Sequence, residues 1–216
     1  MIQCMIFDMD GTIADTLPLC IAAFRKSIGQ LSGRCLTDRE ITDTFGPSEE
    51  GTIAALLPNQ YDEGLALYLK YYGEMHPSMC PDPFPGILPL LSYLKQNGIK
   101  LALVTGKGEK SLAISMDVLG LKREWFDAVQ TGNPLGPSKP QGIQRVLDVL
   151  SVRPGEAVYV GDAVSDIESA RKVSVPVAAA VWAGTSDADR LREYRPDYLF
   201  ETAQGLMEWV SGMLGR

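Results

Sequence analysis

The chain has 216 residues, 45% of them hydrophobic, and a formal charge of -7. This composition supports a folded core and excludes a disordered chain, and the length suits one large domain or a core with a small insert. The acidic balance, with no basic run and no apolar stretch of membrane-spanning length, argues against nucleic-acid and membrane partners.

The first expected element is a buried strand over residues 2–7, a short apolar run. Residues 17–79 then carry helical patterns and no convincing strand. The helical signals are a capping box at Thr37 and Glu40, followed by helical patterns at residues 49–57 and 61–75. Prolines at 77, 81, 83 and 85 indicate a stiff return to the core. An excursion of this length exceeds an ordinary loop.

Strands and helices alternate after this excursion. Further buried strands are expected at residues 100–104, 157–160 and 175–181, and helices at residues 87–96, 110–119, 142–150 and 166–172. The alternation predicts an α/β fold, a doubly wound parallel sheet (Rossmann-like). We expect a helical cap domain, residues 16–79, inserted after strand one of a core formed by residues 1–15 and 80–216.

Acidic residues follow the first strand directly. Asp8 and Asp10 lie two positions apart, and Gly11 permits a turn that brings both carboxylates toward one point. Ligands bind outside the carboxyl ends of parallel strands, where one carboxylate can attack phosphorus and another can transfer a proton. The alternatives are a loop with two solvated acids and a calcium loop, although the latter lacks its later Glu and flanking helices.

Two later segments offer groups that bind phosphate. The hydroxyl of Thr105 and backbone N–H groups near Gly106 follow the second strand, although Thr105 could instead be a helix N-cap. The neighbouring Lys107 is interpreted as a solvated charge. Lys139 precedes a helix and could hold a carboxylate and a phosphate together, or lie on the surface.

A second acidic pair, Asp162 and Asp166, follows the strand at residues 157–160. These residues could simply cap a helix, because Asp is favoured at helix N-termini. Four converging carboxylates without a cation would repel one another strongly. Mg²⁺ prefers carboxylate and water oxygens and usually bridges to a substrate phosphate, so the pattern favours a Mg²⁺ site.

These segments, in this order, resemble the haloacid dehalogenase-like hydrolase superfamily, and the insert is similar to its helical cap. The resemblance implies that Asp8 is the nucleophile and a metal ligand, and that Asp10 is the acid/base and offers its backbone carbonyl to the metal. It implies phosphate binding by Thr105 and Lys139, and metal binding by Asp162 and Asp166. The departures, such as Ala163 where Ser or Thr is common, affect no catalytic group.

The Asp at position 10 distinguishes a phosphatase or phosphomutase from the dehalogenases of the superfamily. The resemblance is nearest to the phosphoglycolate phosphatase type, which implies a Mg²⁺-dependent phosphatase acting on a small phosphorylated metabolite through an aspartyl-phosphate. A sugar-phosphate mutase shares every core residue, and a non-catalytic binding domain is the remaining alternative. Possible substrate contacts in the cap are Arg25, Lys26 and the loop of residues 45–48.

The cysteines bear on the compartment. Cys4, Cys20, Cys35 and Cys80 form no CxxC pair, and His76 is the single histidine. We expect buried, reduced thiols and not a zinc site or disulfides. The apolar N-terminal run is too short for a signal peptide, so the cytoplasm is the expected location. The sequence gives no indication of the oligomeric state.

Overall fold

The computed structural model describes residues 2–214, and within them six parallel strands form one sheet in the order β3-β2-β1-β4-β5-β6. The strands are β1 (Cys4–Phe7), β2 (Lys100–Val104), β3 (Ala128–Gln130), β4 (Ala157–Gly161), β5 (Val177–Ala180) and β6 (Tyr198–Phe200). The helices are α1 (Leu17–Ser32), α2 (Asp38–Thr42), α3 (Glu49–Leu56), α4 (Tyr61–Met79), α5 (Ile87–Gln96), α6 (Glu109–Val118), α7 (Lys139–Leu150), α8 (Val164–Lys172), α9 (Ala188–Glu193) and α10 (Ala203–Leu214), with short 3₁₀ turns at Arg123–Trp125 and Pro154–Glu156.

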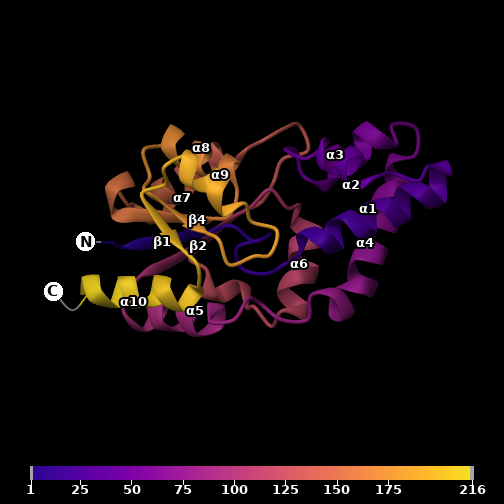
Figure 1. Cartoon of the computed structure of the whole chain (residues 1–216). Coiled ribbons are helices and arrows are strands. Elements are labelled where there is room, and N and C mark those ends of the chain that lie inside the picture. The colour runs from indigo at the N-terminus through magenta and orange to yellow at the C-terminus, as the bar shows by residue number, and fades with distance from the viewer. Residues whose placement is uncertain (1, 215–216) are drawn as a thin grey trace.

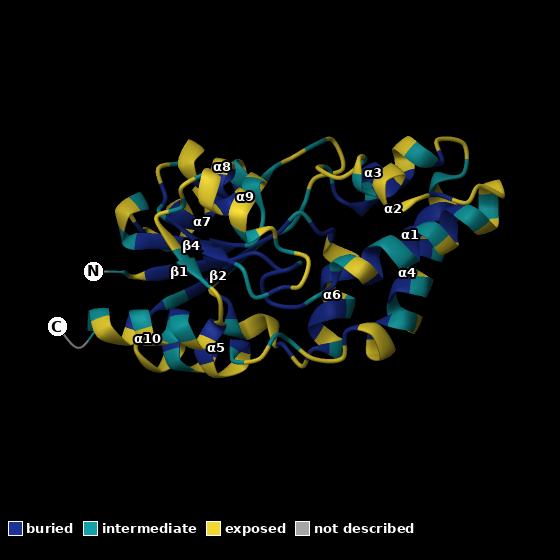
Figure 2. Cartoon of the chain, in the orientation of Figure 1, coloured by how far each residue is buried: buried dark blue, intermediate teal, exposed yellow. Residues whose placement is uncertain are grey.

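Both faces of the sheet are buried under helices (Figures 1 and 2). Along β1, Met5 and Phe7 belong to one core cluster with residues of α5, α6 and α10, whereas Cys4 and Ile6 belong to another with residues of α7 and α8. Successive side chains of a strand point to opposite faces, so a strand covered on both sides needs a continuous apolar run. The predicted doubly wound α/β fold is confirmed.

The chain order reverses at β1, which pairs with β2 on one side and with β4 on the other. The connections that follow the strands beside such a reversal run to opposite faces of the sheet, which leaves a crevice for a ligand outside the carboxyl ends. In Figure 1 the two chain ends lie at one end of the sheet and the inserted helices α1 to α4 lie at the other. The carboxyl ends of β1, β2 and β4 therefore meet below the inserted helices, where the sequence places its acidic residues.

The insertion between β1 and β2 contains α1 to α4, which fall within residues 16–79 where the sequence predicts a cap, and then α5, which falls within the predicted core. Helices α1 to α4 pack around a core cluster of their own, in which Phe24, Tyr68 and Tyr72 are fully buried or nearly so. Helix α5 packs on the sheet instead. The capping box is present, with the Thr37 hydroxyl accepting from Glu40 N at 3.2 Å.

Some boundaries differ from the sequence prediction. Helix α4 continues through Pro77 to Met79, because a proline near a helix end removes only one hydrogen bond from the last turns. Helix α7 begins at Lys139 and not at residue 142. Strands β3 and β6 were not predicted, since each has three residues and lies at an edge of the sheet, where no continuous apolar run is needed.

All four cysteines are free thiols. Cys4, Cys20 and Cys80 are buried as expected, but Cys35 is exposed, so the burial prediction is wrong there. Cys35 lies between α1 and α2, in a connection whose residues 33–35 are all exposed. Between residues 2 and 214, no helix combines the length and the hydropathy needed to cross a bilayer.

Candidate active site

A cavity of about 500 Å³ lies between the carboxyl ends of the strands and the inserted helices. On the core side, the cavity is lined by residues that follow β1, β2 and β4 and by the start of α7. The insertion lines it with residues of α1, of α3 and of the loop between α2 and α3. Both parts of the chain therefore enclose one space, directly over the predicted site residues.

Asp8 and Lys139 form the floor of this cavity. The Lys139 ammonium lies 2.6 Å from Asp8 Oδ2 and 2.5 Å from Asp166 Oδ1. The other oxygen of Asp8 accepts a hydrogen bond from Met9 N at 2.7 Å. Lys139, the first residue of α7, thus joins the end of β1 to the first turn of α8, and it holds the Asp8 carboxylate in a fixed orientation.

Asp8 is 4% exposed, and burial raises its pKa to about 6, with Asp166 and Asp10 acting in the same direction and Lys139 against it. A carboxyl group with a pKa of about 6 is still mostly ionised at neutral pH. Lys139 itself keeps its proton, because its two carboxylate partners raise its pKa well above the usual value although burial opposes this. Asp8 is therefore an anion with little hydration, the form a nucleophile requires.

Asp162 is brought to the same point by a turn that only glycine allows. Gly11 has φ of +76°, and a Cβ atom there would lie 2.0 Å from Asp162 Oδ2. The carboxylate accepts a hydrogen bond from the Thr12 hydroxyl at 3.1 Å. Burial, then Asp166 and Asp8, raise the pKa of Asp162 well above its usual value, which reflects three acids crowded together.

Asp8, Asp162 and Asp166 each offer an oxygen, and these atoms all lie within 4.8 Å of one another. Oxygen donors of this kind suit a hard divalent cation, which would relieve the repulsion that raises the pKa of Asp162. The donor set therefore fits the metal that the sequence predicts. The Asp10 carboxylate does not belong to this set, and the ligand role of its backbone carbonyl stays a prediction.

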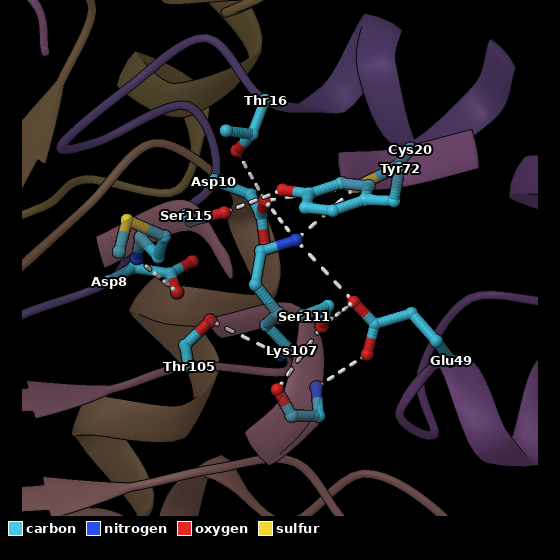
Figure 3. A network of polar contacts seen from close by, with 12 residues as sticks. Asp8, Asp10, Thr16, Cys20, Glu49, Tyr72, Thr105, Lys107, Ser111 and Ser115 are labelled. Carbon is cyan, nitrogen blue, oxygen red and sulfur yellow. Dashed lines mark hydrogen bonds and ion pairs between the residues drawn. The ribbon is translucent and has the colours of Figure 1, made fainter. Parts of the chain in front are cut away.

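The Asp10 side chain turns instead toward Lys107 and Thr16 (Figure 3). Lys107 Nζ lies 3.0 Å from Asp10 Oδ1, and the Thr16 hydroxyl donates to the same oxygen. Burial alone would raise the pKa of Asp10, but Lys107 and Thr16 outweigh it, so the pKa lies below its usual value. The interpretation of Lys107 as a solvated charge is wrong, because its side chain is completely buried.

A glutamate of the insertion meets the same lysine. Glu49 begins α3, and its Oε1 lies 3.4 Å from Lys107 Nζ and accepts from the Ser111 hydroxyl at 2.6 Å. Its Oε2 accepts from Gly108 N at the start of α6 (Figure 3). Glu49 thus ties the inserted helices to the core at the edge of the cavity, close to Asp10.

Comparison with known proteins agrees with this arrangement. Residues 5–180 match the family of haloacid dehalogenase-like hydrolases. The chain belongs to this family. Curated relatives include a pyrophosphatase PpaX of Bacillus pumilus, 28% identical over 97% of this chain and 96% of that protein, and a phosphoglycolate phosphatase of Synechococcus elongatus, 28% identical over 98% of this chain and 99% of that protein.

Solved structures share the fold. A predicted phosphoglycolate phosphatase of Haemophilus somnus superposes with a TM-score of 0.81 over 97% of this chain and 98% of that one, at 17% identity. CbbY of Rhodobacter sphaeroides, in complex with phosphate, gives a TM-score of 0.77 at 21% identity, over 94% and 95%. The chain is therefore a haloacid dehalogenase-like hydrolase with phosphatases among its relatives, and the family implies a divalent metal.

Thr105 and Gly106, which the sequence predicts to bind phosphate, directly follow β2. Thr105 is 2% exposed, and its hydroxyl accepts from Lys107 N at 3.2 Å, so the hydroxyl hydrogen can still be donated. The alternative of an N-cap is not observed, since Gly108 occupies that position of α6. Gly106 lines the cavity, so its backbone faces the ligand space.

The cap contacts expected from the sequence are only partly found. Arg25 donates to Leu36 O and pairs with Asp38, and Lys26 lies over the ring of Tyr71, so neither lines the cavity. Residues 45–47 of the predicted loop do line it. Glu49 was not among the residues predicted to line the site, and no local pattern in the sequence indicates it. Lys107 was predicted to be solvated, although its position after a strand end already places it near the site.

Proposed function

We propose that the protein is a Mg²⁺-dependent phosphatase that hydrolyses a small phosphate monoester through an aspartyl-phosphate on Asp8. One observation supports this most directly: the Lys139 ammonium lies between the buried carboxylates of Asp8 and Asp166, at the floor of the cavity. A carboxylate fixed there by a cation can attack a phosphoryl group bound beside the same cation. Mg²⁺, held by Asp8, Asp162 and Asp166, would supply positive charge to the phosphoryl oxygens.

The reaction then has two halves. In the first, an Asp8 oxygen bonds to phosphorus, the ester P–O bond breaks, and Asp10 gives a proton to the departing alcohol oxygen. In the second, a water oxygen attacks phosphorus, Asp10 takes a proton from that water, and the acyl-phosphate bond breaks to free Asp8 and inorganic phosphate. The Thr105 hydroxyl, the backbone at Gly106 and Lys139 bind the phosphoryl oxygens throughout.

Lys107 holds Asp10 in its ionised form, which is the form required for the second half. For the first half Asp10 must gain a proton. An arriving phosphate ester brings negative charge close to Asp10, and a nearby like charge raises the pKa of a carboxyl group. Substrate entry and protonation of Asp10 are therefore coupled, so the acid is formed only when its substrate is bound.

In this proposal residues 16–79 act as a cap domain over a catalytic core of residues 1–15 and 80–216. Closing such a cap keeps bulk water from the aspartyl-phosphate while one water reacts. The free thiols agree with a cytoplasmic enzyme, because disulfides are rare in that compartment. A phosphomutase would use the same core residues, and no contact of the described residues favours it.

The test is phosphate release from a panel of phosphate monoesters with Mg²⁺, comparing the natural chain with Asp8→Asn. We expect turnover by the natural chain, and a loss of at least about 10³-fold in the variant, because an amide is a poor nucleophile. Mass spectrometry of acid-quenched protein should find a phosphate on Asp8. Undiminished turnover by folded Asp8→Asn would contradict the proposal, and transfer to a second sugar hydroxyl without phosphate release would indicate a mutase.

A further inference from the structure

The wall that faces the leaving group determines which phosphate esters fit this cavity. The inserted helices and their loop contribute mainly apolar side chains to this wall, namely Leu17, Cys20, Phe24, Phe45 and Pro47. Their one charged contribution is Glu49. Among residues 2–214, the cationic side chains that line the cavity are Lys107 and Lys139, both from the core. An anionic leaving group would therefore depend on one of these two lysines.

Lys139 cannot serve a leaving group. Its ammonium is engaged by Asp8 and Asp166 at 2.6 and 2.5 Å, on the nucleophile's side of the phosphoryl group. In an in-line displacement the attacking and the leaving oxygens lie on opposite sides of phosphorus. The positive charge of Lys139 is thus directed at Asp8 and the phosphoryl oxygens.

Lys107 lies beside Asp10, the group that protonates the leaving oxygen in the proposed mechanism, but its ammonium is fully engaged. It lies 3.0 Å from Asp10 Oδ1, 3.4 Å from Glu49 Oε1 and 3.3 Å from Cys20 Sγ. An ammonium has three donors, and these contacts account for all of them. The Nζ atom also lies 4.6 Å from the centre of the Tyr72 ring, with its side chain fully buried (Figure 3). Two carboxylates therefore already neutralise Lys107.

Glu49 cannot turn away to release this lysine. One of its oxygens accepts from the Ser111 hydroxyl at 2.6 Å, and the other accepts from Gly108 N at the start of α6. These donors anchor the carboxylate at a helix N-terminus, where negative charge is stabilised. A carboxylate or phosphate on the leaving group would meet this fixed, buried negative charge.

We infer that the substrate's leaving group is an uncharged alcohol with apolar surface, and that Glu49 is the residue that discriminates against anionic leaving groups. This inference rests on the proposed phosphatase function. It separates this chain from the relatives named for pyrophosphate and phosphoglycolate, whose substrates carry a second anionic group. A cavity of about 500 Å³ also accepts an alcohol larger than glycolate.

The test compares 2-phosphoglycolate with its neutral amide, 2-phosphoglycolamide, because the two leaving groups have nearly the same shape and differ by one charge. Binding is measured by calorimetry with Mg²⁺ on Asp8→Asn, which removes turnover from the measurement. We expect the amide to bind at least about tenfold more tightly, since like charges a few ångströms apart repel strongly in a partly buried site. Benzyl phosphate should bind at least as tightly as the amide.

Glu49→Gln, added to Asp8→Asn, should reduce the preference for the amide to about twofold or less. Glu63→Gln is the matched control, because Glu63 is exposed on α4 and gives the same change in net charge. Phe45→Arg places a cation in the cavity wall and should reverse the preference toward phosphoglycolate, even if Glu49→Gln fails to fold.

Equal or tighter binding of phosphoglycolate to the Asp8→Asn protein would overturn the inference, and so would benzyl phosphate binding tenfold more weakly than the amide. An unchanged preference in folded Glu49→Gln, or in Phe45→Arg, would remove Glu49 and the cap wall as its cause. A failure of the proposed phosphatase function would give a different experimental result. The natural chain would then release no phosphate from any ester, whatever the binding preference of the variant.

Discussion

At the scale of single residues, Asp8 and Asp10 show how two carboxylates two positions apart acquire different properties. Burial raises the pKa of Asp8 to about 6, whereas Lys107 and Thr16 keep that of Asp10 below its usual value despite burial. Both are ionised at neutral pH, but only Asp8 lies against Lys139 and the carboxylate cluster. The local partners, and not the residue type, give the proposed nucleophile and the proposed proton-transfer group their different properties.

Asp10→Ala should affect esters according to their leaving group. An aryl phosphate departs with little protonation, whereas an alkyl phosphate needs an acid that contributes on the order of 10²–10⁴-fold. We therefore expect the first step to be slowed far more for the alkyl ester, and phosphorylated Asp8 to accumulate from the aryl ester. Rapid-quench kinetics with mass spectrometry measures both. Equal slowing of the two esters without trapped phospho-enzyme would contradict the acid/base role.

Gly11→Ala tests the close approach between the loop after β1 and Asp162. A Cβ atom at position 11 would lie 2.0 Å from Asp162 Oδ2, so the carboxylate must move away from Asp8 and Asp166. We expect the Mg²⁺ concentration for half-maximal activity to rise at least about tenfold, because the donor set loses its geometry. A magnesium titration of phosphate release measures it.

Gly33→Ala is the matched control for this prediction. Gly33 has φ of +69°, close to that of Gly11, but no atom lies within 4 Å of the position of its Cβ. Both variants should lose about 1–2 kcal/mol of stability from the left-handed backbone. Only Gly11→Ala should change the magnesium requirement, and a similar change in Gly33→Ala would show that backbone strain, not Asp162, is responsible.

At the scale of elements, α4 and α6 connect the inserted helices to the core through buried polar groups. The Tyr72 hydroxyl and the Ser115 hydroxyl lie 2.7 Å apart, and His76 Nε2 lies 3.1 Å from the same Ser115 oxygen. All three side chains are buried. Buried hydrogen bonds lose much when one partner is removed, so this contact fixes the position of α4 against α6.

A double-mutant cycle of Tyr72→Phe and Ser115→Ala should measure this contact. Each single change should lower the free energy of unfolding by about 1–2 kcal/mol, and the coupling energy should be about 0.5–1.5 kcal/mol. Urea unfolding gives these values. Tyr71→Phe on the same helix removes an exposed hydrogen bond to Gln30 and should cost less than about 0.5 kcal/mol. Coupling near zero would mean that apolar packing alone holds the two helices.

At the scale of the whole molecule, the buried acids link stability to pH and to the metal. Asp8 has a pKa of about 6 in the folded protein against 3.8 for an ordinary Asp, so the folded state binds more protons between these values. The free energy of unfolding therefore falls as pH rises from about 4 to about 6, by on the order of 3 kcal/mol from Asp8 alone. Asp162 acts in the same direction.

Mg²⁺ should reverse this loss, because it binds the ionised carboxylates and displaces their protons. We expect saturating Mg²⁺ to raise the Tm more at pH 7 than at pH 5, and EDTA to abolish both the rise and the activity. Differential scanning calorimetry at the two pH values measures it, with Asp8→Asn as a control in which the difference shrinks. An equal rise at both pH values would show that Asp8 does not take part in metal binding.

The fold class and the location of the acidic cluster follow from the amino-acid sequence alone. Buried parallel strands need apolar runs, and their carboxyl ends meet at one edge, so Asp8 and Asp162 could be brought together by reasoning alone. The edge strands β3 and β6 were not predicted, because a strand of three residues is too short to show a pattern of its own.

The contact of Glu49 with Lys107, beside Asp10, depends on tertiary packing. Glu49 and Lys107 are 58 positions apart and belong to different packing units, and neither has a local pattern that reveals its partner. The burial of Lys107 depends on how α1, α3 and α4 pack over the end of β2, through Cys20, Glu49 and Tyr72. Lys107 is predicted from its sequence neighbourhood to be solvated, but long-range packing buries it beside Asp10, where two carboxylates neutralise its charge.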